Sequence, residues 1–274
     1  MTYNWRCRHC DFVVWSERSK TVQRSIQDHL LDHHRQRLTA NGFQVNWNCP
    51  YCDEYGSDHD EAAAKDAFAT HLGTHMRRSV RTGTHVADEV DGLGNVLVLT
   101  PPESTGASSA RSHFLTRGDI AIVITASVTT RLQLIEARLG AWPEHTIVVT
   151  TKHDPLADIG DVELSAPSLE VVQLDKGLGL SGIGETISRI IAEHNGPETT
   201  FSVAFDILTE IIHTFELEQV FRFIHLLNSR FDSAEALSHY YCNPESNSGP
   251  TLNVLRELFD LRITATSDRL VLDS

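Results

Sequence analysis

Apolar residues follow two different patterns along the 274-residue chain, and the pattern changes near residue 94. Before that point they bracket histidines at helical spacing, with Ile26 and Leu30 in one stretch and Phe68 and Leu72 in another. Beyond it, short β-rich apolar runs alternate with helical stretches. This alternation is typical of a parallel sheet that is covered by helices on both faces.

The runs of the second part predict individual elements. We expect strands at 96–99, 120–124, 146–149, 171–174 and 201–205, and helices at about 108–115, 129–139, 183–194 and 217–229. In the last helix Val220, Phe223, Ile224 and Leu227 recur at helical spacing. The prediction for residues 95–274 is a three-layer α/β domain with a mainly parallel sheet.

The first part contains one motif written twice. Residues 4–11 read Asn-Trp-Arg-Cys-Arg-His-Cys-Asp, and residues 46–53 read Asn-Trp-Asn-Cys-Pro-Tyr-Cys-Asp. After the same gap of 18 residues, each pair of cysteines is followed by a pair of histidines, and equivalent positions differ by 42. The two sets are Cys7, Cys10, His29 and His33, and Cys49, Cys52, His71 and His75. This regularity indicates a tandem duplication of a small metal-binding module.

Two thiolates on a C-x2-C turn and two imidazoles one helical turn apart predict a closed tetrahedral site for structural zinc. Disulfides would not require histidines that repeat with the cysteines. Each module is too small to hold a core alone, so its zinc ion should contribute on the order of 10 kcal/mol to folding. His34 competes with His33 as the fourth ligand of the first site, and the repeat offset favours His33. We expect two structural zinc ions.

The modules resemble C2H2 zinc fingers over residues 5–38 and 47–80, which implies a ββα-like fold and contacts to nucleic acid or a protein partner. Their gap of 18 residues exceeds the usual twelve, so the base-reading positions of the helix cannot be carried over. We expect finger 1 at residues 1–38, finger 2 at 39–80, a linker at 81–94 and the α/β domain at 95–274.

Charge is unevenly distributed. The net charge is −14, yet residues 1–84 carry 11 Lys and Arg against 10 Asp and Glu. An acidic second part repels nucleic acid, so contacts to it would come from the fingers, with Arg77, Arg78 and Arg81 as candidates. The alternative is that these arginines stabilise a helix C-terminus. Surplus acid with four lysines also favours a salt-adapted organism.

No apolar run is long enough to cross a bilayer, and residues 1–8 lack a signal-peptide core. Four cysteines are assigned to metal and Cys242 is left over, which fits a reducing compartment. We therefore expect a cytoplasmic protein without membrane contact.

Two stretches of the second part resemble a nucleotide site. Residues 94–104 predict a strand, a Pro-rich loop and a helix, where a P-loop would lie, and residues 201–206 form an apolar strand ending in an acid, as in a Walker B motif. Here the chain resembles the RecA/KaiC-like family over residues 94–266, and within it a group of uncharacterised haloarchaeal proteins with an eroded active site. Segments typical of that group are 177–184, 220–225 and 258–260. The resemblance implies a relic nucleotide site at Thr100, Ser104 and Asp206.

Departures from that family argue against catalysis. Residues 100–109 contain one glycine, Gly106, and no lysine, and no acid follows the strand at 120–124 to activate water. Without these groups the charge that develops in phosphoryl transfer is not stabilised. Asp206 then either caps the following turn or marks a relic metal or ligand site at the strand edge.

Weaker features complete the picture. Gly177, Gly179 and Gly182 have G-x-G-x-x-G spacing, and with Gly184 they predict either a phosphate cradle or a close-packed turn. The histidines 213, 225 and 239 are expected to be core or surface residues, and no G-x-S-x-G motif supports a hydrolase. Two functions follow. One is a zinc-binding regulatory adaptor whose α/β domain self-associates or senses a ligand without turnover. The other is a nucleotide-dependent ATPase with an unusual phosphate loop.

Overall fold

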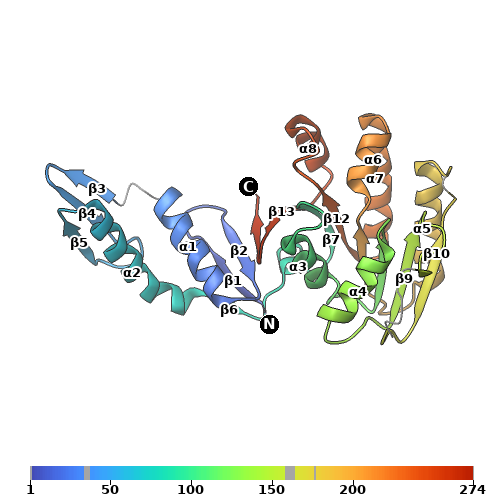
Figure 1. The fold of residues 1–274 in the computed structure, drawn as a ribbon, viewed down its shortest axis with the longest axis horizontal. Coiled ribbons are helices and arrows are strands. Elements are labelled where there is room, and N and C mark those ends of the chain that lie inside the picture. The colour runs from blue at the N-terminus through green and yellow to red at the C-terminus, as the bar shows by residue number, and fades with distance from the viewer. Residues whose placement is uncertain (1, 34–37, 158–163, 176, 274) are drawn as a thin grey trace. The chain divides into compact units, whose positions relative to one another are not determined.

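The computed structural model describes residues 2–33, 38–157, 164–175 and 177–273, with the side chains of residues 76–78 left aside. Its chain divides into two compact units, unit 1 (residues 1–84) and unit 2 (residues 85–274), which are described separately (Figure 1).

Unit 1 contains two similar modules, module 1 (residues 1–38) and module 2 (residues 39–80). The elements are β1 (Tyr3–Arg6), β2 (Val13–Ser16), α1 (Ser19–His33), β3 (Leu38–Asn41), β4 (Gln44–Asn48), β5 (Tyr55–Asp58), α2 (Glu61–Ser79) and β6 (Arg81–Thr82). In each module an antiparallel hairpin precedes the helix, and module 2 adds β3 at the edge of β4. After α2 the chain returns as β6 to pair with β1, so the expected linker begins with a strand.

Each module has a small apolar core under its helix. Val22, Ile26 and Leu30 of α1 are buried, as are Phe68 and Leu72 of α2. All but Val22 are the apolar residues that the helical pattern placed beside the histidines. They lie on the face of each helix that also carries the first histidine, so the core and the cysteine and histidine side chains occupy the same side of the module.

Unit 2 is a sheet with helices on both faces. Its elements are η2 (Val86–Val90), β7 (Gly94–Leu99), α3 (Thr105–Phe114), β8 (Ile120–Ile124), α4 (Val128–Arg138), β9 (His145–Thr150), β10 (Leu169–Gln173), α5 (Leu180–His194), β11 (Phe201–Phe205), α6 (Leu208–Thr214), α7 (Leu217–Ser233), β12 (Ala236–Cys242), α8 (Gly249–Arg256), β13 (Leu261–Thr266) and β14 (Arg269–Leu272). Within the unit the strand order is β10-β9-β8-β11-β12-β7-β13-β14. All neighbours are parallel except the hairpin of β13 and β14. The predicted mixed α/β fold with a mainly parallel sheet is confirmed.

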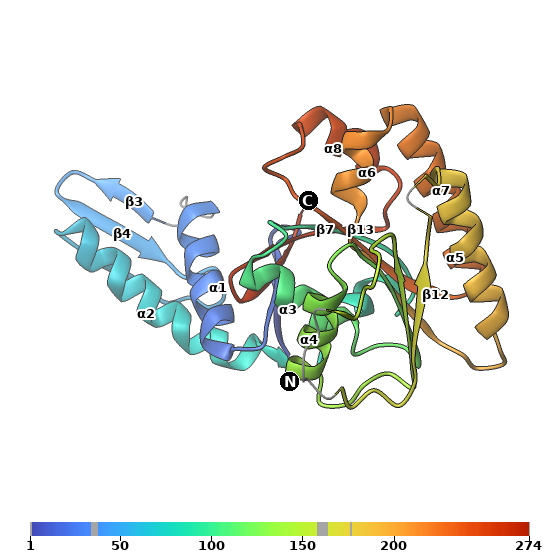
Figure 2. The ribbon, with the colours of Figure 1, turned by 45° about the vertical axis from the view of Figure 1, so that its right-hand side comes forward.

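Alternation along the strands sends side chains to opposite faces. On one face Leu97 and Phe205 join a cluster with α5, α6, α7 and α8. On the other face α3 packs against α4 and against β13 (Figures 1 and 2). Residues 85–94 of the expected linker belong to unit 2, where His85 and Val86 are buried.

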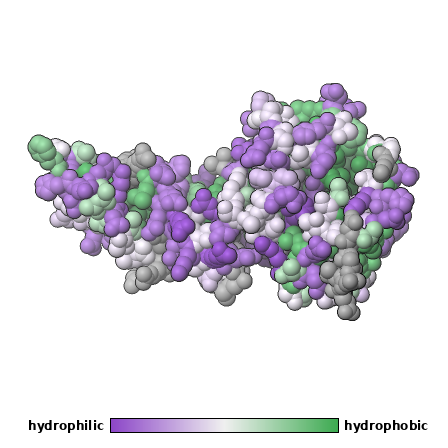
Figure 3. Space-filling model, viewed as in Figure 1, coloured by the Kyte–Doolittle hydropathy of each residue, from purple (hydrophilic) through white to green (hydrophobic). Residues whose placement is uncertain are grey.

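Hydrophilic residues cover most of the face seen in Figure 3, and apolar residues appear there in small patches. The exposed large apolar side chains of the described residues include Phe43 at 90% and Leu226 at 61%. Among the described residues, no helix combines the length and the apolar character that a membrane span requires.

Candidate metal centres and a buried ion cluster

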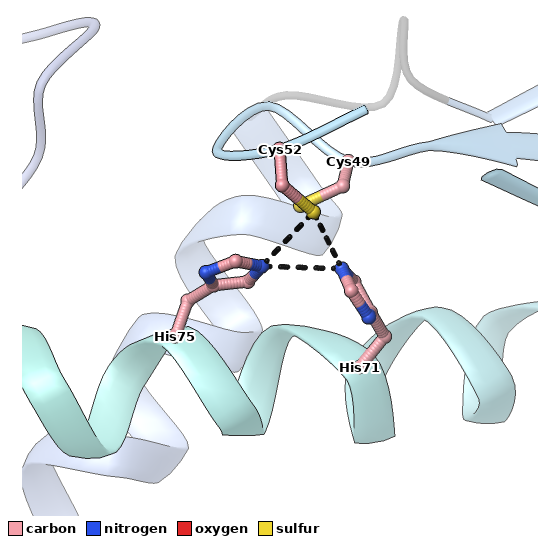
Figure 4. A group of neighbouring side chains, drawn as sticks. All are labelled: Cys49, Cys52, His71 and His75. Carbon is pink, nitrogen blue, oxygen red and sulfur yellow. Dashed lines mark hydrogen bonds between the residues drawn. The ribbon is translucent and has the colours of Figure 1, made fainter. Parts of the chain in front are cut away.

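The turn between β4 and β5 positions the two cysteines of module 2. The Cys49 N–H donates to the Glu54 carbonyl at 2.9 Å, which closes the turn. The Tyr51 N–H donates to Cys49 Sγ at 3.4 Å, so the backbone already points a donor at the sulfur. His71 and His75 lie one turn apart on α2 and face the cysteines (Figure 4). Local geometry alone therefore brings two sulfurs and two imidazoles together.

Distances in module 2 fit a tetrahedral ion. Cys52 Sγ lies 3.4 Å from His71 Nε2 and 3.3 Å from His75 Nε2, and the two Nε2 atoms are 3.2 Å apart (Figure 4). With zinc bonds of about 2.3 Å to sulfur and about 2.05 Å to nitrogen, a tetrahedron places sulfur and nitrogen about 3.6 Å apart and two nitrogens about 3.4 Å apart. The ligand atoms of Cys49, Cys52, His71 and His75 all lie within 4.8 Å of one another. This group can hold a metal ion.

Module 1 repeats the arrangement with one difference. The ligand atoms of Cys7, Cys10 and His29 lie within 4.8 Å of one another, and Cys10 Sγ is 3.3 Å from His29 Nε2. The His33 ring lies beside the His29 ring, with centroids 5.2 Å apart, and His33 is not a member of that converging group. His34 lies outside the described residues. The choice of fourth ligand in module 1 stays a prediction.

A tryptophan holds the first histidine of each site. The Trp5 and His29 rings are 6.1 Å apart, and the Trp47 and His71 rings are 5.3 Å apart. Such aromatic contacts favour particular orientations of the two rings. Burial raises the pKa of the Cys49 thiol, which keeps the sulfur protonated at neutral pH. A metal ion that bound there would therefore displace a proton.

The three candidate arginines for nucleic-acid contact lie around the end of α2. Arg77 and Arg78 fall in its last turn, where cations oppose the helix dipole, and their side chains are outside the described set. Arg81 is exposed on β6. Position alone is compatible with either expectation for these residues.

The loop after β7 is closed by its own side chains. Thr100 Oγ1 lies 2.9 Å from Ser104 Oγ, and Ser104 Oγ accepts the Ala107 N–H at 3.0 Å as the N-cap of α3. A Cβ on Gly106 would lie 2.7 Å from the Ala265 carbonyl oxygen. The one glycine of this loop therefore allows α3 to approach β13 closely.

Asp206, at the end of β11, is part of a buried ion cluster. Arg111 Nε donates to Oδ1 at 2.8 Å, and Arg131 Nε donates to Oδ2. The side chains of Asp206 and Arg111 are 3% exposed and that of Arg131 is 8% exposed. Both oxygens accept from arginines, and no described N–H of the following turn donates to them, so the expected turn cap does not describe this arrangement. The expected relic metal or ligand site at the strand edge stays a prediction.

Opposing effects set the charge of that carboxyl. Burial raises the pKa of Asp206, but the guanidinium groups of Arg111 and Arg131 outweigh it, and the net pKa is lowered. The carboxylate is therefore ionised together with two cations. Arg111 also stacks over the Tyr241 ring at 4.5 Å and donates to the Pro102 carbonyl at 3.1 Å.

A buried hydrogen-bond network that includes one neutral histidine, His239, continues from Tyr241. Ser202 donates to the Phe114 carbonyl at 3.2 Å, so His239 Nε2 must donate to Ser202 Oγ, 3.1 Å away, and His239 Nδ1 accepts from the Tyr241 hydroxyl at 2.9 Å. Burial lowers the pKa of His239 to about 3. As expected, this histidine is a satisfied core residue.

His85 and His113 form a buried pair of histidines, with ring centroids stacked 3.8 Å apart. His85 Nε2 donates to the His113 carbonyl at 2.8 Å, and its Nδ1 accepts the Ala87 N–H at 3.0 Å. His113 Nε2 accepts the Val86 N–H at 3.1 Å. Burial lowers the pKa of His85 to about 4 and places that of His113 well below its ordinary value. Sequence patterns gave no sign of this pair.

The glycine-rich stretch before α5 is partly explained by packing. A Cβ on Gly182 would meet the Leu178 side chain at 2.4 Å, which supports the close-packed turn. Around Gly179 there is open space, and this residue lines a groove of about 670 Å³ between α5 and α7.

A family model with the description "Family of unknown function (DUF7504)" matches residues 94–265. The chain belongs to the DUF7504 family. The match runs from β7 into β13, so the ion cluster and His239 lie inside the DUF7504 region and both metal modules lie before it.

Solved structures resemble the chain only distantly. A Pyrococcus horikoshii OT3 protein solved as project PH0250 is 10% identical, with 66% of this chain and 85% of that chain covered and a TM-score of 0.44. The uncharacterized protein PH0321 from Pyrococcus horikoshii, solved in complex with an unknown peptide, is 12% identical, with 62% and 76% covered and a TM-score of 0.41. No curated protein matches the sequence.

Proposed function

We propose that this DUF7504 protein is a zinc-binding, non-catalytic regulatory adaptor. Two structural zinc ions hold unit 1 in shape for contact with a partner, and unit 2 serves interaction or sensing. The observation that carries the proposal is the convergence of Cys49, Cys52, His71 and His75. Two thiolates with two imidazoles in a tetrahedron suit zinc, and a complete protein ligand set is typical of structural sites.

The resemblance to C2H2 zinc fingers and to RecA/KaiC-like domains belongs to this proposal. Support for a degenerate nucleotide site comes from the side chains that fill it. Asp206 is bound by two arginines, Ser104 caps α3, and Gly106 is needed for packing. The loop also lacks the lysine that would contact phosphates. We therefore propose that this chain does not hydrolyse ATP.

Between the two partner classes, the arrangement of unit 1 favours a protein. Helices α1 and α2 pack against each other, which takes up surface that a finger helix would insert into the DNA major groove. Residues 39–80 carry three Lys and Arg against six Asp and Glu, so module 2 is a poor match for phosphates.

Four measurements test the proposal. Metal analysis of the purified full chain should give two zinc ions per molecule. Isothermal titration with ATP and magnesium should give no binding heat, and a phosphate-release assay should give no turnover. Binding with turnover would establish the ATPase alternative. If the protein shifts the electrophoretic mobility of labelled duplex DNA in a salt-dependent way, the partner is nucleic acid and not protein.

A further inference from the structure

The two modules of unit 1 meet at equivalent positions of their repeat. His9 and Tyr51 are each the residue before the second cysteine of a C-x2-C turn, 42 positions apart. Their ring centroids lie 6.1 Å apart with an interplanar angle of 53°, within the range of aromatic contacts. The equivalent helices α1 and α2 also pack together. Contacts between equivalent parts are what a local two-fold arrangement of two copies produces.

Tyr51 reaches both metal centres. Its ring lies 5.8 Å from the ring of His75, a ligand of its own module. Its hydroxyl is buried and has no hydrogen-bond partner among the described residues. The ring of module 1 that Tyr51 contacts belongs to His9, whose N–H donates to Cys7 Sγ at 3.4 Å, so Tyr51 also lies beside the cysteine turn of module 1.

A buried hydroxyl without a partner is unfavourable, and such a group calls for an acceptor. The metal-free cysteine thiols of module 1 are weak acceptors. A metal converts them to thiolates, which accept charge-assisted hydrogen bonds. Loading module 1 therefore supplies the acceptor that Tyr51 lacks.

We propose that Tyr51 couples the two metal centres, its ring packing on His75 while its hydroxyl donates to a metal-bound thiolate of module 1. Filling either site then raises the affinity of the other, and unit 1 responds to zinc as one two-metal unit. The inference rests on the proposed zinc occupancy, and it adds a positioning role for Tyr51.

Native mass spectrometry of the metal-free full chain, titrated with zinc, measures this coupling. At half saturation two equal and independent sites leave about half of the molecules with one metal, whereas about tenfold coupling lowers that fraction to about a quarter. We expect the low fraction for the unmodified chain.

Variants distinguish loss of the contact between the two modules from loss of the fold of one module. His9→Ala keeps all the ligands of both modules and Tyr51→Phe keeps the ring, and both should raise the one-metal fraction. Tyr51→Ala should raise it most. Tyr55→Ala is the matched control, because this tyrosine of module 2 is 77% exposed and should change nothing.

Coupling through Tyr51 is overturned if His9→Ala and Tyr51→Phe leave the fraction at the value of the unmodified chain, or if Tyr55→Ala has the same effect as Tyr51→Ala. Should Tyr51→Ala lose the fold of module 2, the other two variants still decide. A chain that binds no zinc refutes the proposed function, whereas two zinc ions that bind independently refute the coupling alone.

Discussion

Mild acid should destabilise unit 2, because three buried histidines are held neutral there. The pKa of His85 is about 4 and that of His239 about 3, against an ordinary value of 6.5, and that of His113 is lowered as well. Where the pKa is lower in the folded state, the unfolded chain binds more protons below pH 6.5. Stability is therefore lost as pH falls from about 6.5 towards the folded pKa values.

The size of the loss follows from these values. At pH 5 an unfolded histidine gains about 2 kcal/mol from protonation, while folded His85 and His239 gain almost nothing, so the pair lowers the free energy of unfolding by about 4 kcal/mol. The whole free energy of unfolding of a typical domain is only about 5–15 kcal/mol. The cause is structural, since protonating His239 Nδ1 removes the acceptor of the Tyr241 hydroxyl.

Urea unfolding at pH 7, 6 and 5 checks this prediction. Unfolding is followed by hydrogen exchange of peptides from β11 and β12, so that loss of metal from unit 1 does not interfere. His239→Asn should be less stable at pH 7 and should lose about 2 kcal/mol less between pH 7 and 5. His225→Gln, at an exposed position, is the control. A free energy of unfolding that is flat between pH 7 and 5 would refute the reasoning.

Three further substitutions test the site assignments. Gly106→Ala should destabilise unit 2 by about 1–3 kcal/mol in urea unfolding, because its Cβ meets the backbone of β13, whereas Gly140→Ala, with open space around it, should stay within about 0.5 kcal/mol. Asp206→Asn should cost about 3–5 kcal/mol by leaving two buried guanidinium groups without their anion, and a loss below about 1 kcal/mol would mean that the cluster is solvated. Cys49→Ser should remove the zinc of module 2 and unfold that module in circular dichroism, while the melting of unit 2 is unchanged; a shared collapse would show that the units do not fold independently.

The metal groups were predictable because their geometry is local. A C-x2-C turn and histidines four residues apart on a helix place their own ligand atoms, and the duplication supplies a second copy as a check. The contact between His9 and Tyr51 was not predictable, since no local pattern states how two modules face each other. Its signal was present only as two rings at the same repeat position.

In unit 2 the apolar runs placed five strands, but β12, β13 and β14 were missed. The strand β12 shows one reason. Ser238 and His239 interrupt its apolar pattern although both are fully buried, because hydrogen bonds to Asn95 and to Ser202 and Tyr241 satisfy them. Polar residues with such distant partners resemble a loop in the sequence. The same limit hid the histidine pair at 85 and 113.

Asp206 shows why a motif did not settle a function. The strand ending in an acid was visible, but its partners Arg111 and Arg131 lie 95 and 75 residues away on two helices. Arginines in amphipathic helices are ordinarily surface residues, so their burial gave no signal. The two arginines determine the charge around the Asp206 carboxylate. To bind magnesium the carboxylate would have to share an oxygen with a guanidinium group, and the two neighbouring cations repel a divalent ion. The ion cluster and a magnesium nucleotide site would therefore compete for the same oxygens. The two arginines stabilise the first through ionic hydrogen bonds, and no lysine in the loop offsets the cost of the second.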